Sequence, residues 1–306
     1  MNEIKVFCPA TIANISCGFD VLGLCLDTIG DEMIIRKTGK KGVRITKIIG
    51  QELPLEAGKN VAGVAALAML DKIDADHGFE MEIHKKIKPG SGIGSSAASA
   101  AGAVFGINEL LDKPFTKHEL VGFAAKGEKV ACGVVHADNV APALLGGFTL
   151  VRSCDPLDVI NIHTPEELVA TVIHPQIEVK TADARAVLKQ NVPLKKAIIQ
   201  WGNVGALIAG LFTEDYELIS RSLHDEIVEP HRSILIPGFN AIKSSSIEAG
   251  ALGCGISGSG PSIFALSKGL ETANKVAETM KGVYKEIGID YDIHVSKINT
   301  LGTKIV

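Results

Sequence analysis

The stretch PGSGIGSS, residues 89–96, lies between a predicted strand at 79–87 and a predicted helix at 95–111. Its three alternating glycines let successive backbone N–H groups turn towards one point, and the start of a helix adds partial positive charge there. A concave arrangement of this kind binds phosphate. The loop therefore predicts a phosphate or nucleotide site between a strand and a helix.

Two other types of glycine-rich loop do not fit this sequence. A Walker P-loop needs a lysine directly after its last glycine, but Ser95 stands in that place. A Rossmann fingerprint needs the spacing GxGxxG, whereas the glycines here are at 90, 92 and 94. A plain strand-to-helix turn with Ser95 as the helix N-cap stays open, although three glycines and two serines exceed what a cap needs.

Composition limits the class of protein. The 306 residues are 46% hydrophobic and 22% charged, which is enough for a large core in one or two domains. The net charge of −4, without a basic block, predicts no nucleic-acid partner. No signal peptide and no apolar run of about 18 residues is present, so we expect no membrane partner and a cytoplasmic location. Six scattered cysteines without a CxxC pair are interpreted as reduced core thiols.

Strand and helix patterns are mixed along the chain. In the first half, strands are predicted at 4–8 (ended by Pro9), 32–38, 43–49, 79–87 and 146–152, and helices at 60–70, 95–111 and 117–130. The second half has predicted strands at 168–174, 253–256, 262–267 and 289–297, and helices near 182–189, 194–212, 215–223 and 237–250. Because the two kinds do not alternate strictly, the fold class is α+β. The segment 153–167 is expected to separate two domains, 1–160 and 161–306.

Three motifs in order resemble one family. GIGSSAA at 92–98 resembles the phosphate loop of the GHMP kinases, PATIAN at 9–14 with GFDVLG at 18–23 resembles their amino-terminal motif, and GISGSGP at 255–261 their carboxy-terminal motif. The resemblance covers essentially the whole chain. It implies a two-domain GHMP kinase fold, with a ribosomal protein S5 domain 2-like N-terminal domain that binds ATP and a ferredoxin-like C-terminal domain.

Details within the family resemble its homoserine kinase branch. Thr11 stands where other members usually carry Lys or Arg, and Asn139 stands where others place a catalytic aspartate. The segments TADAR at 181–185 and EPHR at 229–232 resemble that branch's substrate-binding arginine segments. The resemblance implies phosphorylation of the L-homoserine hydroxyl by ATP in threonine biosynthesis, and a homodimer.

Homoserine is a zwitterion with a distal hydroxyl, so its site needs groups of both charges. Arg185 and Arg232 could clamp the carboxylate, Asp20 could pair with the ammonium, and Asn14 could hydrogen-bond the hydroxyl. The resemblance assigns these same roles. It adds two further substrate contacts, His136 and Asp138, for which a plain structural role stays equally open.

For ATP, the resemblance makes Glu128 the partner of Ser96 on Mg²⁺ and places Asn60 near adenine. The predicted nucleotide-binding residues are Asn60, Pro89, Gly90, Ser91, Gly92, Ile93, Gly94, Ser95 and Ser96. No side chain is an evident strong base. Asn139, with Asn14, is therefore expected to act by holding the hydroxyl in line, while the proton leaves late and passes to the γ-phosphate.

Alternative functions predict different features. A mevalonate- or shikimate-type kinase of the same family acts on a carboxylate without an ammonium, so Asp20 beside two arginines argues against it. A non-catalytic nucleotide-binding regulator usually shows decay of the phosphate loop or metal ligands, but Ser96 and Glu128 are both present. A pure interaction protein would have large apolar surface and no clustered glycine loops.

Overall fold

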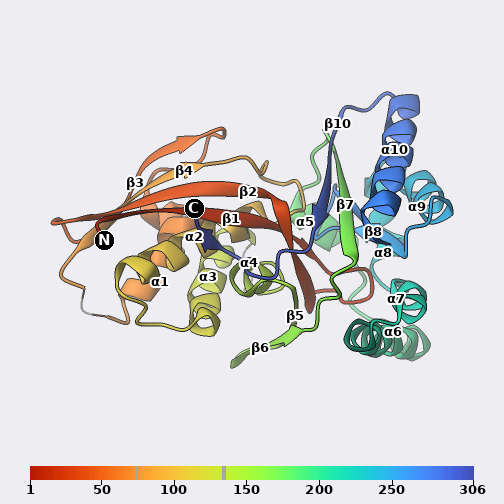
Figure 1. Cartoon of the computed structure of the whole chain (residues 1–306), viewed down its shortest axis with the longest axis horizontal. Coiled ribbons are helices and arrows are strands. Elements are labelled where there is room, and N and C mark those ends of the chain that lie inside the picture. The colour runs from red at the N-terminus through yellow and green to blue at the C-terminus, as the bar shows by residue number, and fades with distance from the viewer. Residues whose placement is uncertain (74, 133–135) are drawn as a thin grey trace.

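The computed structural model describes residues 1–73, 75–132 and 136–306, which form two sheets with helices (Figure 1). The larger sheet has seven strands: β1 (Glu3–Ala13), β2 (Leu22–Thr38), β3 (Gly42–Ile49), β4 (Gly78–His84), β5 (Phe148–Cys154), β6 (Leu157–Ile162) and β11 (Lys304–Ile305). Its main order is β11-β1-β2-β4-β3, while β5 pairs with β2 and β6 pairs with β5. Only β3 and β4 pair in parallel among these strands.

Four helices lie together below the larger sheet in Figure 1: α1 (Val61–Leu70), α2 (Ser95–Leu110), α3 (Lys117–Cys132) and α4 (Val140–Leu145). The β1 sequence explains this one-sided cover, since Ile4, Val6 and Cys8 are buried while Glu3 before them and Lys5 between them are exposed.

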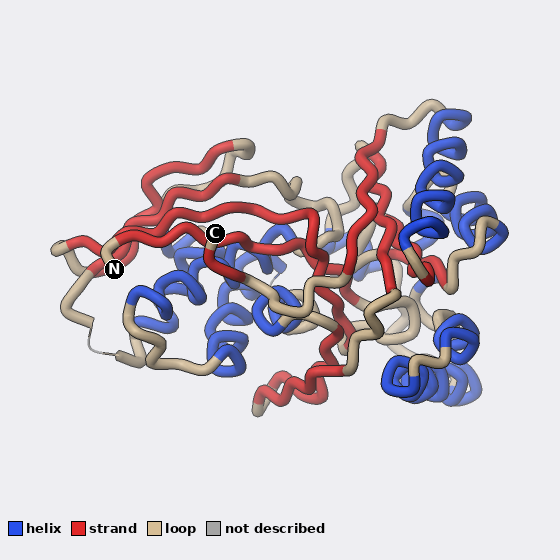
Figure 2. The backbone as a smooth tube through the Cα atoms, viewed as in Figure 1, coloured by secondary structure: helices blue, strands red, loops and turns tan. Residues whose placement is uncertain are grey.

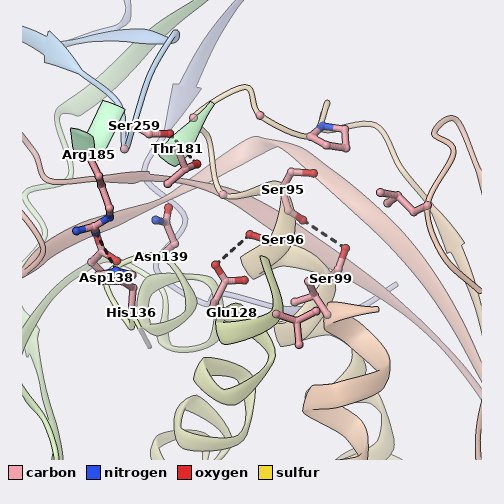
Figure 3. Close-up of a pocket in the computed structure, with 18 of the residues that line it drawn as sticks. Ser95, Ser96, Ser99, Glu128, His136, Asp138, Asn139, Thr181, Arg185 and Ser259 are labelled. Carbon is pink, nitrogen blue, oxygen red and sulfur yellow. Dashed lines mark hydrogen bonds between the residues drawn. The ribbon is translucent and has the colours of Figure 1, made fainter. Parts of the chain in front are cut away.

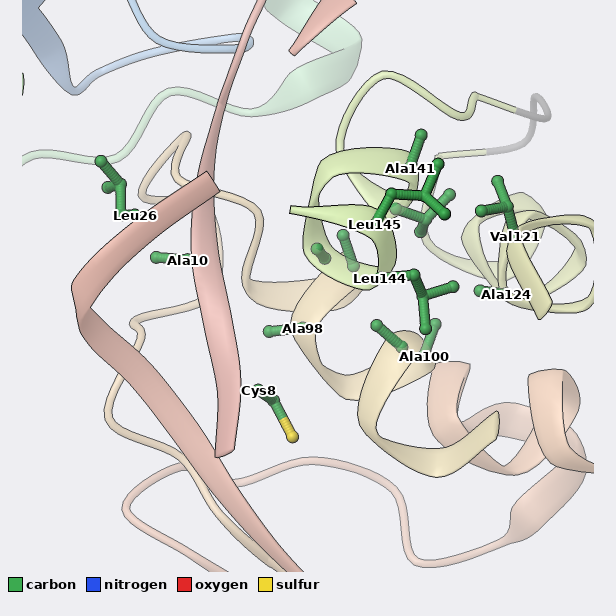
Figure 4. Close-up of a cluster of buried hydrophobic side chains, with 14 of the residues drawn as sticks. Cys8, Ala10, Leu26, Ala98, Ala100, Val121, Ala124, Ala141, Leu144 and Leu145 are labelled. Carbon is green, nitrogen blue, oxygen red and sulfur yellow. The ribbon is translucent and has the colours of Figure 1, made fainter. Parts of the chain in front are cut away.

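Small residues let α2 lie close to β1. Figure 4 shows Ala98 of the helix facing Ala10 of the strand, near Cys8. Gly102 is needed at this contact because a Cβ there would come within 2.2 Å of the Cys8 sulfur. Close packing of α2 on the strands fixes the place where the helix begins, which is also where the phosphate loop ends.

The smaller sheet is antiparallel, in the order β10-β7-β9-β8. Its strands are β7 (Leu168–Pro175), β8 (Gly253–Ile256), β9 (Ile263–Lys268) and β10 (Tyr291–Lys297). Helices α9 (Phe239–Glu248) and α10 (Leu270–Ile287) cover one face, and α5 (Thr181–Ala186), α6 (Leu194–Thr213), α7 (Tyr216–Ser222) and α8 (Glu229–Arg232) complete this half. Leu168, Val172 and Phe264 belong to the same buried cluster as the core of the larger sheet. The smaller sheet therefore shares the core of the larger sheet on one side, while a second buried cluster, with Phe239, Ile263 and Met280, lies between it and α9 and α10.

The α+β prediction and the two-domain fold are confirmed, and Figure 2 shows strands and helices in both halves. Several local predictions were wrong. The first strand does not end at Pro9; it continues to Ala13 through an irregular register between Pro9 and Thr11, which accommodates the missing N–H donor. The strand predicted at 32–38 begins already at Leu22. The strands on either side of residues 39–42 are not neighbours, because β4 lies between them.

Strand β6 falls inside the segment expected to separate the domains. The long helix α10 and the short elements α4, α8 and β11 were not predicted. The division at 160/161 stays a prediction.

Most of the cysteines described are core residues. Cys8, Cys17, Cys25 and Cys254 are buried and reduced, but Cys154 is exposed at the end of β5, so the core interpretation was wrong for it. The side chain of Cys132 lies outside the described residues. In the part of the chain that the structure describes, no helix is both long and apolar enough to cross a bilayer.

Candidate active site

A cavity of about 410 Å³ collects residues that are far apart in the sequence (Figure 3). Of the predicted site residues, these line it: Asn14, Asp20, Asn60, Pro89, Gly90, Gly92, Gly94, Ser95, Ser96, Glu128, His136, Asp138, Asn139, Arg185 and Arg232. Ser91 and Ile93 do not line it; both are buried, and Ile93 belongs to the hydrophobic core. Their side chains therefore support the loop from behind, while its glycines and later serines line the cavity.

The phosphate loop has the backbone that its glycines predict. Gly90, Gly92 and Gly94 have φ angles of 74°, 84° and 72°, all in the left-handed region. A Cβ on Gly94 would lie 2.0 Å from the Thr11 hydroxyl oxygen, and one on Gly92 would lie 2.6 Å from the Ser257 carbonyl oxygen. These two positions accept no other residue without a shift of the backbone. Alternating left-handed residues before a helix form an anion-binding concavity.

The other two motifs hold this loop in place. The Thr11 N–H donates to the carbonyl oxygen of Ile93 at 3.1 Å, and the Ser257 hydroxyl donates to that of Gly92 at 2.7 Å. Thr11 comes from β1, whereas Ser257 directly follows β8 of the smaller sheet. The three motifs thus meet at one place, between the two halves of the protein.

A buried ion pair that the sequence did not predict fixes the start of α2. Lys85 and Asp31 form the pair, and the Lys85 ammonium also donates to the Ser95 carbonyl oxygen at 2.8 Å. The Ser95 hydroxyl donates to the Ile87 carbonyl oxygen at 2.9 Å. Ser95 is therefore already engaged in holding the loop to the end of β4. The only sign of this pair in the sequence is that Asp31 and Lys85 have opposite charges and each lies near an end of a predicted strand.

Ser96 and Glu128 meet as predicted, with the Ser96 hydroxyl donating to a Glu128 carboxylate oxygen at 3.0 Å (Figure 3). Burial raises the pKa of Glu128 to about 7, and the hydrogen bond from Ser96 acts in the opposite direction. Both groups offer oxygen ligands of the kind that Mg²⁺ prefers. No cluster of three or more His, Cys, Asp or Glu exists among the residues described. The donor set therefore fits magnesium.

Asp20, Arg185 and His136 form a charged group on the other side of the cavity. Arg185 donates to both Asp20 carboxylate oxygens, at 2.9 and 3.2 Å, and its terminal nitrogen lies 2.9 Å from Nε2 of His136. Because an arginine can only donate, this His136 nitrogen must accept and the ring is neutral. Burial lowers the pKa of His136, in agreement.

Arg232 lies deeper and is only 3% exposed. Its guanidinium donates to the carbonyl oxygens of Ala184 at 2.8 Å and Gly258 at 3.1 Å, and it lies 4.9 Å from the centre of the Phe19 ring. Within the described chain, no carboxylate forms an ion pair with Arg232. Burial lowers its pKa to about 10, so the charge is costly where it stands. A buried cation of this kind is suited to an anionic ligand.

The two asparagines differ in what they offer. The Asn14 amide donates to the Gly258 carbonyl oxygen at 2.7 Å and accepts the Asp20 N–H at 3.0 Å, so it mainly fixes two loops. The Asn139 side-chain oxygen accepts a hydrogen bond from Thr11 at 2.7 Å. This contact sets the orientation of the amide and keeps its NH₂ group for another acceptor.

Asp138 and Asn60 complete the predicted set. Burial raises the pKa of Asp138 to about 7, and the negative charge of Asp20 adds to the effect. Asn60 caps α1: its side-chain oxygen accepts the Ala62 N–H at 3.0 Å, and its NH₂ group donates to the Pro54 carbonyl oxygen at 2.8 Å. Asn60 lines the cavity chiefly as a structural residue.

Sequence analysis did not predict the residues that position Arg232 and the loop of Asp20. Gln200 of α6 donates to the Cys17 carbonyl oxygen at 2.8 Å and to the Asp225 carboxylate at 2.9 Å. Asp225 in turn accepts the backbone N–H groups of Val228 and Glu229, each at 2.9 Å, at the start of the helix that carries Arg232. Cys17 belongs to the loop that carries Asp20. These residues are too distant in sequence for a pattern to reveal them.

Thr181 and Ser259 also line the cavity without having been predicted, and their hydroxyl oxygens lie 3.4 Å apart. Both residues stand inside segments that had been singled out, TADAR and GISGSGP. The signal for Thr181 and Ser259 was therefore their position: each is a hydroxyl residue within a motif already assigned to the site.

Comparisons with known proteins identify the family of this chain. Residues 60–147 match the GHMP kinases N-terminal domain and residues 207–286 match the GHMP kinases C-terminal domain. The chain is 48% identical to a homoserine kinase of Chlorobium phaeobacteroides over the full length of both. It is also similar to a crystal structure of homoserine kinase from Cytophaga hutchinsonii, at 52% identity and a TM-score of 0.97, covering 100% of this chain and 98% of that one. The L. major mevalonate kinase, at 18% identity and a TM-score of 0.67 over 97% of this chain and 95% of that one, shares the fold.

Proposed function

The chain belongs to the GHMP kinase family, and from this we infer that it transfers the γ-phosphoryl group of ATP to the hydroxyl of L-homoserine. The observation that carries the inference is one cavity with a phosphate-binding loop on one side and a paired-charge clamp on the other. The phosphate-binding loop provides a site for the phosphates of ATP. Groups of both charges account for an amino acid as acceptor. The product would be O-phospho-L-homoserine, and we propose that it serves threonine biosynthesis.

The phosphates of ATP would lie against residues 90–96, where the loop N–H groups and the α2 terminus face the cavity. Ser96 and Glu128 would hold Mg²⁺ there, and the ion would offset the negative charge of the β- and γ-phosphates. Glu128 must be ionised to do so, which the raised pKa makes dependent on pH.

The amino acid would be held by its two charges. Its carboxylate would lie at Arg232, the buried cation without an ion-pair partner in the described chain, with Arg185 beside it. Its ammonium would lie at Asp20. In the structure Asp20 and Arg185 neutralise each other, so substrate binding exchanges an internal ion pair for two intermolecular ones. This exchange selects for a zwitterion, because a ligand without the carboxylate leaves the buried Arg232 unpaired, and one without the ammonium draws Arg185 away from Asp20 without replacing it.

Asn139 would orient the acceptor hydroxyl. Its NH₂ group can donate to the hydroxyl oxygen, while Thr11 keeps the amide from turning. Phosphoryl transfer has a loose transition state, so holding the two reacting oxygens in line supplies much of the rate. The proton would leave late, towards the γ-phosphate. We further propose a homodimer that works in the cytoplasm, where ATP and free amino acids are available.

The test is a coupled assay of ADP release with Mg-ATP and, in turn, L-homoserine, mevalonate, shikimate and galactose. Homoserine should be the substrate used. Gamma-hydroxybutyrate, which lacks the ammonium, and aminopropanol, which lacks the carboxylate, should each lose at least about a hundredfold in kcat/KM, since the first draws Arg185 away from Asp20 without replacing it and the second leaves the buried Arg232 unpaired. Equal use of either analogue would contradict the charge clamp.

Arg232→Ala tests whether Arg232 binds the amino-acid substrate. Arg152→Ala is the matched control, because Arg152 is an exposed arginine on β5. Arg232→Ala should raise the KM for homoserine strongly while ATP binding stays intact. Arg152→Ala should change neither. If Arg232→Ala impaired both substrates to the same extent, the assignment of Arg232 to the amino acid would be wrong.

A further inference from the structure

The helix α6 carries an exposed apolar face that the catalytic cavity does not use. Six residues follow one another in alternating steps of four and three, and we call them the α6 stripe: Leu194, Ile198, Trp201, Gly205, Ile208 and Phe212. Leu194 is 68% exposed, Ile198 51%, and Trp201 and Phe212 are each 57% exposed. This spacing places the six on one side of the helix. In Figure 1, α6 lies at the outer edge of the molecule.

Ile208 is partly buried against the core and the centre of the Phe212 ring lies 6.2 Å from that of His163, but the rest of the stripe is not needed to attach α6 to the protein. The residues that do so, Gln200, Leu207 and Leu211, are buried and lie on the opposite side of the helix. An outer helix face normally carries charged residues, but residues 197–213 contain none. A contiguous apolar surface on an otherwise polar exterior marks a contact with another molecule.

We propose that the α6 stripe binds the α6 stripe of a second copy of this chain, with the two helices antiparallel across a two-fold axis. Such an axis near residue 203 places Leu194 of one copy opposite Phe212 of the other, and Ile198 opposite Ile208. It also places Trp201 opposite Gly205. The arrangement is isologous, with the same surface used on both copies. It goes beyond the proposed homodimer by naming the face and the register.

The sizes of the side chains favour this register. Trp201 is the largest member of the stripe and Gly205 the smallest, and they become partners twice in the antiparallel pair. A Cβ built on Gly205 meets nothing within 4 Å, so the glycine leaves an open place on the helix surface. An indole ring can lie there without pushing the helices apart.

The charges at the two ends of the helix favour the antiparallel direction. Lys195 stands at the amino-terminal end, while Glu214 and Glu217 follow the carboxy-terminal end. An antiparallel pair brings the lysine of each copy towards the acidic end of the other. A parallel pair would bring like charges together. A membrane surface would instead favour basic residues along both flanks of the stripe.

The test is sedimentation over a range of protein concentrations. The wild-type chain should be a dimer, and Ile198→Asp should weaken self-association at least about a hundredfold, because it buries a carboxylate between apolar side chains. Leu270→Asp is the matched control, since Leu270 is a similarly exposed (53%) leucine on α10. It should remain a dimer. Dilution of the wild-type protein should shift the emission of Trp201, the single tryptophan, to longer wavelength.

The direction of pairing has its own test. Lys195→Glu and Glu214→Lys should each weaken the dimer, and the variant carrying both should regain it, because each new charge then faces its opposite. Monomeric wild-type protein, or a dimer unaffected by Ile198→Asp, would overturn the proposal. Wild-type protein that sediments with anionic vesicles, when Ile198→Asp does not, would assign the stripe to a membrane instead. None of these measurements depends on kinase activity, so the proposed function can fail or stand separately.

Discussion

Gln200→Leu should weaken the binding of the amino acid but not of ATP, although Gln200 does not line the cavity. Its amide joins the loop that carries Asp20 to Asp225, which accepts backbone N–H groups at the start of the helix of Arg232. Leucine has a similar size and fits a buried position, so the variant removes hydrogen bonds without leaving a large cavity. The Cys17 carbonyl oxygen and one Asp225 oxygen then each lose a partner.

The magnitude follows from the bonds that are lost. Gln200 makes three: to the Cys17 carbonyl oxygen, to the Asp225 carboxylate and from the Glu226 N–H, which it accepts at 2.9 Å. Two neutral hydrogen bonds contribute about 1 kcal/mol each, and one to a carboxylate about 2 kcal/mol. The free energy of unfolding should therefore fall by about 4 kcal/mol at most. If losing the hydrogen bond to the Asp225 carboxylate weakens homoserine binding by the same free energy, about 2 kcal/mol, the KM for homoserine rises about thirtyfold.

Steady-state kinetics with homoserine and ATP varied separately would measure the effect, and urea unfolding would measure the loss of stability. Asn203→Leu is the matched control, because Asn203 lies on the same helix and donates to the His224 carbonyl oxygen at 3.1 Å, outside the clamp. It should leave both KM values unchanged. An unchanged KM for homoserine in Gln200→Leu, or equal increases for both substrates, would refute the reasoning.

Four further changes test other parts of the site. Gly94→Ala should raise the KM for ATP at least about tenfold in the same assay, because its φ of 72° and its contact with Thr11 exclude a Cβ. Ser96→Ala should raise the Mg²⁺ concentration needed for half-maximal activity, measured by titration at fixed ATP. Asp138 has a folded-state pKa of about 7, above its ordinary value, so the folded state binds a proton more strongly and loses stability as pH rises from about 4 to about 7. Unfolding in urea at several pH values should show a smaller fall for Asp138→Asn. Lys85→Met should cost about 3–5 kcal/mol in urea unfolding, because it leaves the Asp31 carboxylate buried without its cation.

The parts of the site that the sequence predicts are local in the chain. The φ angles of Gly92 and Gly94 follow from the residue type, and a run of three glycines and two serines can be recognised without knowing its neighbours. The meeting of Ser96 with Glu128 was predicted only through the resemblance to a family. Nothing in the local pattern distinguishes Glu128 from an exposed helical glutamate.

What could not be predicted depends on contacts between distant segments. Gln200 looks like any polar residue of an amphipathic helix until α6 is placed against the loop at Cys17. Lys85 would be taken as a solvated charge, because its partner Asp31 lies two strands away along the chain. Likewise, the insertion of β4 between β2 and β3 is a matter of pairing between strands, on which the hydrophobic alternation of each strand carries no information.

The hydrogen bonds from Thr11 and Ser257 to the phosphate loop also bear on how this protein could be divided or recombined. Residues 1–160 contain the whole glycine–serine sequence, yet some of the hydrogen bonds that hold its backbone come from Ser257 and Ser262 in the second half of the chain. A fragment or fusion carrying only the first half would keep the signature of a nucleotide-binding loop without the support that shapes it. Nucleotide binding is therefore a property of the complete molecule, and it is not a module that can be transplanted with its motif.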